Sequence, residues 1–280
     1  MRAAFLGPRG TFSEEALRAS APPGTEEIPY PTVYETVMAV QDSQVDRALV
    51  PIENSLEGSV TATLDALAGE ARDVRISGEV VQPVTHNLIA RREMPLDEVE
   101  QVMSHPQASA QCELFLRERL PGAARASAPS TAEAVRVVAG SGEPWAALGS
   151  RLAADLYGCH VLAEGVEDRT DNQTRFVWLS RVGDVEAAVG GRCKTSVVFW
   201  GFNDESPGAL VDVLREFADR DVNLTKIESR PRRLGLGRYM FFVDLEGSAG
   251  DAPVSGALEA LEHRVETLRL LGSYSAAVTG

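Results

Sequence analysis

The sequence predicts an α/β protein whose C-terminal part is a separate ferredoxin-like βαββαβ domain. Short apolar runs alternate with amphipathic stretches from residue 3 to residue 179. This alternation favours α/β layers with parallel sheets. The pattern is interrupted at residues 183–192, a stretch rich in Gly, Ala and Val, where we expect the domain boundary. The remaining segment predicts strand, helix, strand, strand, helix and strand, which is the order of a ferredoxin-like sandwich.

Each expected element follows from its apolar period and its flanking residues. In the first region we expect strands at residues 3–6, 48–50, 74–81, 87–90, 99–103, 145–148, 161–162 and 177–179. Pro51 is expected to end the second of them. One helix is expected to open at Thr11 or Ser13. Further helices are expected at residues 32–41, 59–67, 106–118, 131–139 and 150–157. In the second region we expect strands at 195–201, 222–229, 238–245 and at the end of 265–274, with helices at 207–220 and 254–264.

Composition narrows the class of protein. The chain has 280 residues, of which 44% are hydrophobic, enough for two domains with their own cores. Its net charge of -14 argues against nucleic acid and membrane surfaces as partners. The odd cysteine count, with no paired spacing, indicates free thiols in a reducing cytoplasm: Cys112, Cys159 and Cys193. We expect neither a signal peptide nor a membrane span.

No cofactor or metal is expected. The histidines lack metal-site spacing: His86, His105, His160 and His263. A nucleotide-binding fingerprint is also lacking in the sequence.

Four loops of the first region carry small polar side chains where a strand ends or a helix begins. They are residues 7–13 (Gly-Pro-Arg-Gly-Thr-Phe-Ser), 51–60 (Pro-Ile-Glu-Asn-Ser-Leu-Glu-Gly-Ser-Val), 104–108 (Ser-His-Pro-Gln-Ala) and 174–176 (Thr-Arg-Phe). Ligands of open α/β sheets bind at the carboxyl ends of strands, and helix N-termini there offer free amides to anions. The four loops therefore predict one cleft that binds an anionic small molecule, with the planar fork of Arg175 suited to a carboxylate.

Purely structural interpretations of these loops stay open. Residues 7–13 are also compatible with a turn and a helix cap, and Ser104 with the cap of the helix that Pro106 begins. A Ser-His hydrolase is disfavoured because neighbouring residues rarely face each other as a triad requires. Residues 51–60 are the hardest to explain structurally, because they place several polar side chains directly after an apolar strand.

Together these strings resemble the prephenate dehydratase family, in the family's order. The C-terminal segment resembles a phenylalanine-sensing ACT domain, marked by Gly-Ala-Leu-Val at 208–211 and Glu-Ser-Arg-Pro at 228–231. The resemblance implies a catalytic domain at residues 1–183, bilobed like the type 2 periplasmic binding proteins, and a regulatory domain at 194–280. It also implies inhibition by L-phenylalanine and self-association into a dimer or tetramer.

The implied reaction converts prephenate to phenylpyruvate, carbon dioxide and water without a cofactor. Residue types and the resemblance together assign Thr174 as donor to the leaving hydroxyl, and Arg175 as carboxylate clamp or ion-pair strut. Phe176 is expected to pack against the substrate ring or to support Thr174. The other candidates are Asn54 and Ser55 for substrate oxygens, Glu53 for orienting its partners, Thr11, Ser104 and Gln107 for the polar lining, and His105 as a proton source.

Phenylalanine is expected to bind at an interface between two copies of the C-terminal domain. The turn at Gly208, Ala209 and Leu210 offers backbone amides for the effector's carboxylate. Acceptors and an apolar wall are expected from Asn223 and Leu224, and the Glu228–Ser229 pair belongs to the same expected site. Gly208 is also compatible with a turn and no ligand. Two other functions remain open: an arogenate dehydratase, and a non-catalytic sensor of an aromatic ligand.

Overall fold

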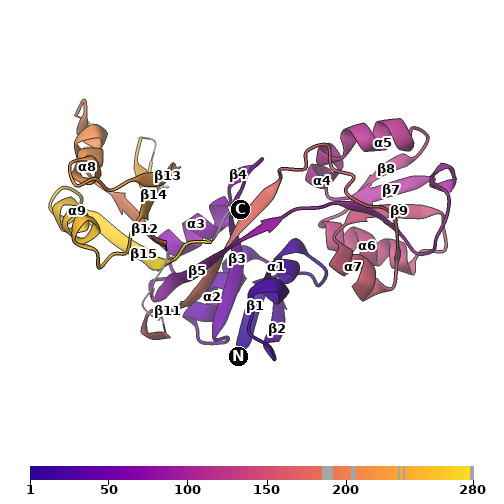
Figure 1. Ribbon diagram of the computed structural model, residues 1–280, viewed down its shortest axis with the longest axis horizontal. Helices are drawn as coiled ribbons and strands as arrows, with labels where there is room; N and C mark the ends of the chain where they lie inside the picture. Colours follow the sequence, from indigo (N-terminus) through magenta and orange to yellow (C-terminus); the bar gives the residue numbers. More distant parts are fainter. Residues whose placement is uncertain (185–191, 203–205, 233, 236, 278–280) are drawn as a thin grey trace. The chain divides into compact units, whose positions relative to one another are not determined.

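The structure is a computed structural model that describes residues 1–184, 192–202, 206–232, 234, 235 and 237–277 (Figure 1). The chain forms two compact units. One unit comprises Met1–Thr36, Leu49–Gly58 and Val81–Phe176, and the other comprises Val37–Ala48, Ser59–Val80 and Val177–Gly280. The boundary expected at 183–192 falls largely on residues 185–191, outside the described residues.

A six-stranded sheet has the order β2-β1-β3-β11-β5, with β4 paired to β3. Its strands are β1 (Arg2–Leu6), β2 (Glu26–Tyr30), β3 (Arg47–Asn54), β4 (Gly58–Ser59), β5 (Val74–Pro83) and β11 (Gln173–Arg181). Its accompanying helices are α1 (Phe12–Ser20), α2 (Val33–Gln41) and α3 (Thr61–Ala68), and η2 (Val182–Asp184) follows β11. The expectation that Pro51 ends its strand is wrong, because β3 continues to Asn54. Proline lacks only the amide donor, and its carbonyl and its φ remain compatible with a strand.

A five-stranded sheet has the order β10-β6-β9-β7-β8. Its strands are β6 (Asn87–Ala90), β7 (Gln101–Ser104), β8 (Ala124–Ser127), β9 (Trp145–Gly149) and β10 (His160–Ala163). β7 runs parallel to β8 and β9, whereas β6 runs antiparallel to β9 and β10. The expectation of parallel sheets is therefore only partly right, since this sheet is mixed.

Both faces of the five-stranded sheet are covered, which explains its continuous apolar strands. Leu88 and Ile89 are successive residues of β6 and belong to two separate core clusters. The helices are α4 (Pro106–Gln111), α5 (Glu113–Arg119), α6 (Thr131–Gly140) and α7 (Arg151–Tyr157), after the short turn η1 (Leu96–Glu98). Figure 1 shows α5 on one face and α6 with α7 on the other. The single helix expected at 106–118 is divided at Cys112, whose φ of -117° leaves the helical region.

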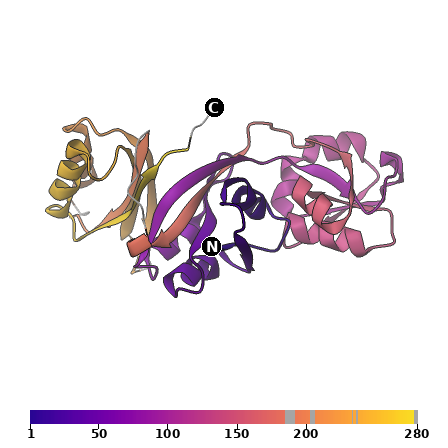
Figure 2. The same cartoon turned by 60° about the horizontal axis from the view of Figure 1, so that its bottom comes forward.

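The C-terminal segment has the predicted βαββαβ order. Its elements are β12 (Cys193–Trp200), α8 (Ala209–Ala218), β13 (Leu224–Pro231), β14 (Tyr239–Glu246), α9 (Ala252–Glu262) and β15 (Thr267–Ser275). The sheet order is β13-β14-β12-β15, and all its pairs are antiparallel. α8 and α9 lie on one face (Figure 2), over a core that includes Phe199, Phe217 and Leu261. The predicted α/β class and the predicted C-terminal βαββαβ order are confirmed.

The other face of this four-stranded sheet packs on α3 and β5 within the same unit. Lys194 Nζ lies 2.8 Å from Glu79 Oε1. A Cβ on Gly272 would lie 2.2 Å from the carbonyl oxygen of Ile76, so the backbone approach of β15 to β5 requires glycine. Arg269 donates hydrogen bonds to the carbonyl groups at the end of α3, Ala68 among them.

Candidate active site

Thr174 lies near the start of β11 and is buried, with 9% of its surface exposed. Its Oγ1 accepts a hydrogen bond of 2.9 Å from Nδ2 of Asn54, the last residue of β3. A hydroxyl that accepts from an amide keeps its own hydrogen for another partner. Asn54 and Thr174, 120 positions apart in the sequence, thus form a hydrogen-bonded pair in which the Thr174 hydroxyl can donate to a ligand.

The orientation of the Asn54 amide is fixed by the backbone. Its Oδ1 accepts from the backbone amides of Leu56 and Glu57, both at 3.0 Å. Because those donors need an oxygen acceptor, the Nδ2 group must face the other way, toward Thr174. The second hydrogen of Nδ2 goes to Oδ1 of Asn172 at 2.8 Å. Both Asn54 hydrogens are therefore used.

The chain of side-chain amides continues from Asn172 to helix α4. Asn172 Nδ2 donates to Gln111 Oε1 at 3.0 Å, and Gln111 Nε2 donates to Glu57 Oε1 at 3.3 Å. The same Gln111 Oε1 lies 3.1 Å from Nε2 of His86. Burial lowers the pKa of His86, against the hydrogen bond with Gln111 and the charge of Glu167, which act to raise it.

Sequence reasoning gave no site role to four members of this network: Glu57, His86, Gln111 and Asn172. Asn172 precedes Thr174 by two positions and so shares its side of an extended chain. Gln111 follows Gln107 by one helical turn. The spacing of Asn172 from Thr174 and that of Gln111 from Gln107 were visible in the sequence. Nothing near His86 in the sequence indicated its contact with Gln111.

Ser55 joins the loop after β3 to the start of β11. Its backbone amide donates to the Gln173 carbonyl at 2.9 Å, and its Oγ accepts from the Gln173 amide at 3.0 Å. Oγ also donates to the carbonyl of Asp171 at 3.3 Å. The Ser55 hydroxyl is therefore engaged in holding Asn54 beside β11.

Arg175 and Phe176 extend to opposite sides of β11, as neighbouring strand residues do. Phe176 is 2% exposed and lies on the same buried side of the strand as Thr174. Arg175 Nε lies 3.5 Å from Glu53 Oε2, and the Arg175 side chain is only 11% exposed. This ion pair is compatible with both roles expected of Arg175, the carboxylate clamp and the strut.

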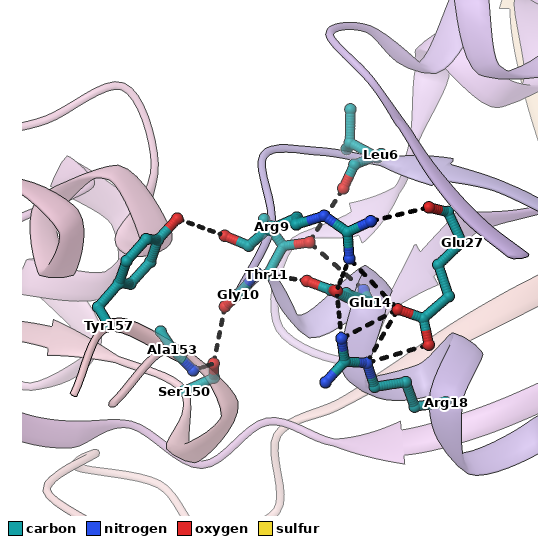
Figure 3. Close-up of polar contacts among 10 residues, drawn as sticks. All are labelled: Leu6, Arg9, Gly10, Thr11, Glu14, Arg18, Glu27, Ser150, Ala153 and Tyr157. Atoms are coloured by element: carbon teal, nitrogen blue, oxygen red, sulfur yellow. Dashed lines mark hydrogen bonds and ion pairs between the residues drawn. The ribbon is translucent and has the colours of Figure 1, made fainter. Parts of the chain in front are cut away.

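The first motif forms a hydrogen-bonded turn that Figure 3 shows in detail. Thr11 is the cap of α1: its Oγ1 donates to the Leu6 carbonyl at 3.0 Å and accepts from the Glu14 amide at 3.4 Å. Glu14 has no exposed surface and pairs with Arg9 and Arg18 at 3.0 and 2.8 Å. The Thr11 hydroxyl is therefore engaged within the turn, as its capping interpretation predicts.

Two side chains of α7 and its cap hold the same turn. Ser150 Oγ donates to the Gly10 carbonyl at 2.8 Å, and Tyr157 Oη donates to the Arg9 carbonyl at 3.1 Å (Figure 3). Gly10 has a φ of +85°, and a Cβ there would lie 3.1 Å from Ala153. Gly10 thus allows the chain to approach α7 closely and to adopt a left-handed turn.

The third motif also differs from expectation in its cap. His105, not Ser104, caps α4, since His105 Nδ1 accepts from the Gln107 amide at 3.3 Å. Ser104 is fully buried at the end of β7, and its Oγ donates to the Leu148 carbonyl at 3.1 Å. Ser104 belongs to the strand and cannot turn to the helix start. Gln107 is exposed.

Two of the cysteine thiols, those of Cys112 and Cys159, are poorly suited to act as nucleophiles. Burial raises the pKa of the Cys112 thiol far above its usual range, and that of Cys159 is also raised. Thiols of this kind are poor nucleophiles. Among the described residues, no group of three or more His, Cys, Asp or Glu side chains is placed to hold a metal ion. No helix in the described ranges is long and apolar enough to cross a membrane.

The expected effector segment has a left-handed turn at its centre. Gly208 precedes α8 with a φ of +87°, and a Cβ there would meet nothing within 4 Å. The conformation alone favours glycine. Ala209, Leu210 and Leu224 are half-buried against the domain core, whereas Asn223 and Ser229 are exposed.

Glu228 contacts a residue of the second loop. Glu228 Oε2 accepts from Ser59 Oγ at 3.1 Å, and Lys226 Nζ donates to the same Ser59 Oγ at 2.8 Å. Arg230, two residues on, forms a bidentate pair with Asp65 of α3, in which Nη2 donates to Oδ2 at 3.0 Å and Nε donates to Oδ1 at 3.3 Å. Alternate residues of β13 therefore hold the segment that begins at Ser59, five residues after Asn54.

Comparison with known proteins shows similarity to prephenate dehydratases along nearly the whole chain. Residues 3–184 match the family model for prephenate dehydratase, and residues 199–263 match that for the ACT domain. A prephenate dehydratase of Mycobacterium tuberculosis is 40% identical over 283 residues, covering 98% of this chain and 87% of the relative.

Solved structures extend the likeness to the fold. Prephenate dehydratase from Arthrobacter aurescens, solved in complex with L-Phe, is 40% identical with a TM-score of 0.89, covering 98% of this chain and 90% of the other. A structure named GqqA and described as a novel type of quorum-quenching acylase is 32% identical, with a TM-score of 0.88 and coverages of 99% and 98%. With its four motifs in order, its paired Asn54 and Thr174 and its C-terminal ACT domain, this chain belongs to the prephenate dehydratase family.

Proposed function

We propose that this chain converts prephenate to phenylpyruvate, carbon dioxide and water, and that Thr174 donates a hydrogen bond to the leaving ring hydroxyl. The observation that supports this role is the direction of the Asn54–Thr174 bond. Asn54 donates to Thr174, so the Thr174 hydrogen is left to point toward a ligand. The activity is the one for which the family is named.

The reaction breaks two bonds and makes an aromatic ring. The ring carboxylate leaves as carbon dioxide, its bonding electrons enter the ring, and the hydroxyl departs with one added proton as water. A Thr hydroxyl is too weak an acid to supply that proton outright, so we assign it to stabilising the departing oxygen while the proton comes from solvent or from His105. One preorganised donor of this kind lowers a barrier by about 2.7–4 kcal/mol.

The remaining candidates take supporting or binding roles in this proposal. Asn54 orients Thr174, and Ser55 holds the loop that carries Asn54. Arg175 provides positive charge for the pyruvyl carboxylate from a side chain braced by Glu53. His105 Nε2 and the exposed Gln107 are proposed substrate contacts at the start of α4. Thr11 acts through the turn that it caps, and Ser104 acts through the bond by which it joins β7 to β9.

The proposed domain division is catalytic for residues 1–183 and regulatory for 194–280. In this view L-phenylalanine binds the regulatory domain, as it binds the Arthrobacter aurescens protein. We further propose that two copies associate through this domain. β13 is an edge strand of its sheet, and Ile227 on β13 and Val211 on α8 are 47% and 53% exposed. An edge strand with exposed apolar side chains is a surface suited to pairing.

The deciding experiment follows phenylpyruvate by its absorbance in alkali after the purified protein is incubated with prephenate. Parallel reactions contain arogenate and are followed by the L-phenylalanine that they form, because dehydration of arogenate keeps the amino group and gives no phenylpyruvate. Thr174→Ala and Thr174→Ser serve as matched variants. We expect turnover of prephenate, a large loss in Thr174→Ala and partial activity in Thr174→Ser, which keeps the hydroxyl. A higher kcat/KM for arogenate would reassign the substrate. Binding of an aromatic ligand without turnover would identify a sensor, and an amide-hydrolysis assay tests the acylase named for the GqqA structure.

Regulation is tested on the intact chain by calorimetry and by light scattering with and without L-phenylalanine. We expect saturable binding and a mass of at least two copies. A monomer that binds no phenylalanine would refute the proposed control while leaving the catalytic proposal intact.

A further inference from the structure

We propose that His86 is a positioning residue of the active site: its neutral ring donates from Nε2 to Gln111 and thereby fixes the amide chain that orients Thr174. This inference rests on the proposed function of Thr174. His86 lies between β5 and β6, is 3% exposed, and takes no part in the motifs of the sequence.

The direction of every bond in the network follows from its fixed end. The backbone amides of Leu56 and Glu57 force the Asn54 amide to present Nδ2 to Asn172. Asn172 must then present Oδ1 to Asn54 and Nδ2 to Gln111. Gln111 therefore presents Oε1 to Asn172 and also to His86, while its Nε2 faces the Glu57 carboxylate.

An oxygen that faces His86 requires a donor on the ring. Only Nε2 is within hydrogen-bond distance of Gln111, at 3.1 Å, so the ring must carry its hydrogen on Nε2. If the ring carried its hydrogen on Nδ1 instead, the lone pairs of His86 Nε2 and Gln111 Oε1 would face each other. Gln111 would then rotate and present hydrogens to the Nδ2 of Asn172, and the chain to Thr174 would lose its order.

The rest of the His86 environment holds the ring and offers nothing to Nδ1. The backbone amide donates to Glu167 Oε2 at 2.8 Å, and the backbone carbonyl accepts from Val166 at 2.9 Å. The ring packs against Phe12, with centroids 5.4 Å apart and planes at 85°. Nδ1 is buried and has no hydrogen-bond partner among the described residues.

An unpartnered buried nitrogen costs free energy that an apolar residue would avoid. A role in stability alone therefore does not account for histidine at this position, whereas a fixed donor toward Gln111 does. The Gln111 side chain is long and only partly buried, and a second donor at its Oε1 restricts its rotation.

The kinetic test uses two amides that differ by one methylene. In His86→Gln the amide nitrogen reaches about as far as Nε2, whereas in His86→Asn it reaches only as far as Nδ1. We expect His86→Gln to keep kcat within about threefold and His86→Asn to lose about tenfold, with KM nearly unchanged, because one neutral hydrogen bond is worth about that factor. Melting temperatures of the two variants should agree closely. Equal kcat values in both variants, or losses that follow the melting temperature, would overturn the proposal.

A double variant tests the route of action. If His86 acts through Gln111, then His86→Asn should cause little further loss in a Gln111→Ala background. Losses that multiply in the double variant would show that His86 acts by another route.

A measurement independent of activity separates this inference from the proposed function. In long-range ¹H–¹⁵N spectra of the intact, ¹⁵N-labelled chain at pH 7, one of its four histidines should be neutral and protonated at Nε2, and its signals should vanish in His86→Gln. An Nδ1–H tautomer or a charged ring at His86 would refute the inference. If the tautomer is as expected but prephenate is not converted, the proposed function fails and the orientation of the network stands.

Discussion

Replacing Asn54 with Asp tests whether the direction of one hydrogen bond controls the reaction. The substitution keeps shape and size, and one carboxylate oxygen can still accept from the backbone amides of Leu56 and Glu57. The other oxygen then faces Thr174 Oγ1, so that an acceptor stands where the amide donor lies at 2.9 Å in the wild type. The Thr174 hydroxyl must turn its hydrogen toward the introduced carboxylate and away from the substrate.

The expected loss is that of one preorganised donor. We expect kcat for prephenate to fall by about 10²–10³-fold, equivalent to about 2.7–4 kcal/mol, with a smaller change in KM. Thr174→Ala should lose a similar factor, and combining it with Asn54→Asp should cost little more, since both remove the same interaction. Far-ultraviolet circular dichroism and a thermal melt of each variant check the fold.

A kcat within threefold of wild type in a folded Asn54→Asp protein would refute the role given to the Asn54–Thr174 bond. Fully multiplicative losses in the double variant would show that Asn54 acts on the substrate directly and not through Thr174.

Three further predictions concern Arg175 of the candidate active site, Ser59 of the loop after β3, and Gly208 of the expected effector segment. Arg175→Lys should raise KM about tenfold, because an ammonium cannot replace a bidentate fork; a lower melting temperature with unchanged KM would instead make Arg175 a strut for Glu53. Ser59→Ala removes the hydroxyl shared by Lys226 and Glu228, and should leave uninhibited kcat intact while raising several-fold the phenylalanine concentration needed for half inhibition; an unchanged value would exclude this link from control. Gly208→Val should abolish phenylalanine inhibition, and Gly208→Asn, which tolerates the left-handed turn, should abolish it too if the space is needed for a ligand; retained inhibition in Gly208→Asn would limit Gly208 to the turn.

The sequence predicted most elements because periodicity and caps are local properties. The βαββαβ order of the C-terminal segment and most strands of the first region follow directly from apolar spacing. β2 (Glu-Glu-Ile-Pro-Tyr) and β8 (Ala-Arg-Ala-Ser) were not predicted, since neither has a period that marks a strand. β2 pairs with β1 and β8 pairs with β7 along their lengths, and no local signal in the sequence carries that information.

The site shows a similar limit. Motifs named the residue types, but they did not predict the hydrogen bond that joins Asn54 to Thr174. The hydroxyls of Thr11 and Ser104 were expected in the polar lining of the site. In the structure Thr11 donates to the backbone carbonyl of Leu6, and Ser104 donates to that of Leu148. A sequence gives the chemistry of a side chain, while its partners depend on which segments the fold brings within about 3 Å.

The loop after β3 places two functions close together along the chain. Asn54, at one end, orients Thr174, and Ser59, five residues later, is bonded to Lys226 and Glu228 of β13. Phenylalanine can inhibit only if it binds one arrangement of the chain more tightly than another. If the two arrangements differ in the position of β13, they differ in the anchoring of Ser59. Glu57 and Leu56 are only two and three residues from Ser59, so the backbone carries that difference to their amides, which fix Asn54. Inhibition would then act on the direction of the Thr174 hydroxyl, so it should lower kcat more than it raises KM, and prephenate should weaken phenylalanine binding only slightly in return.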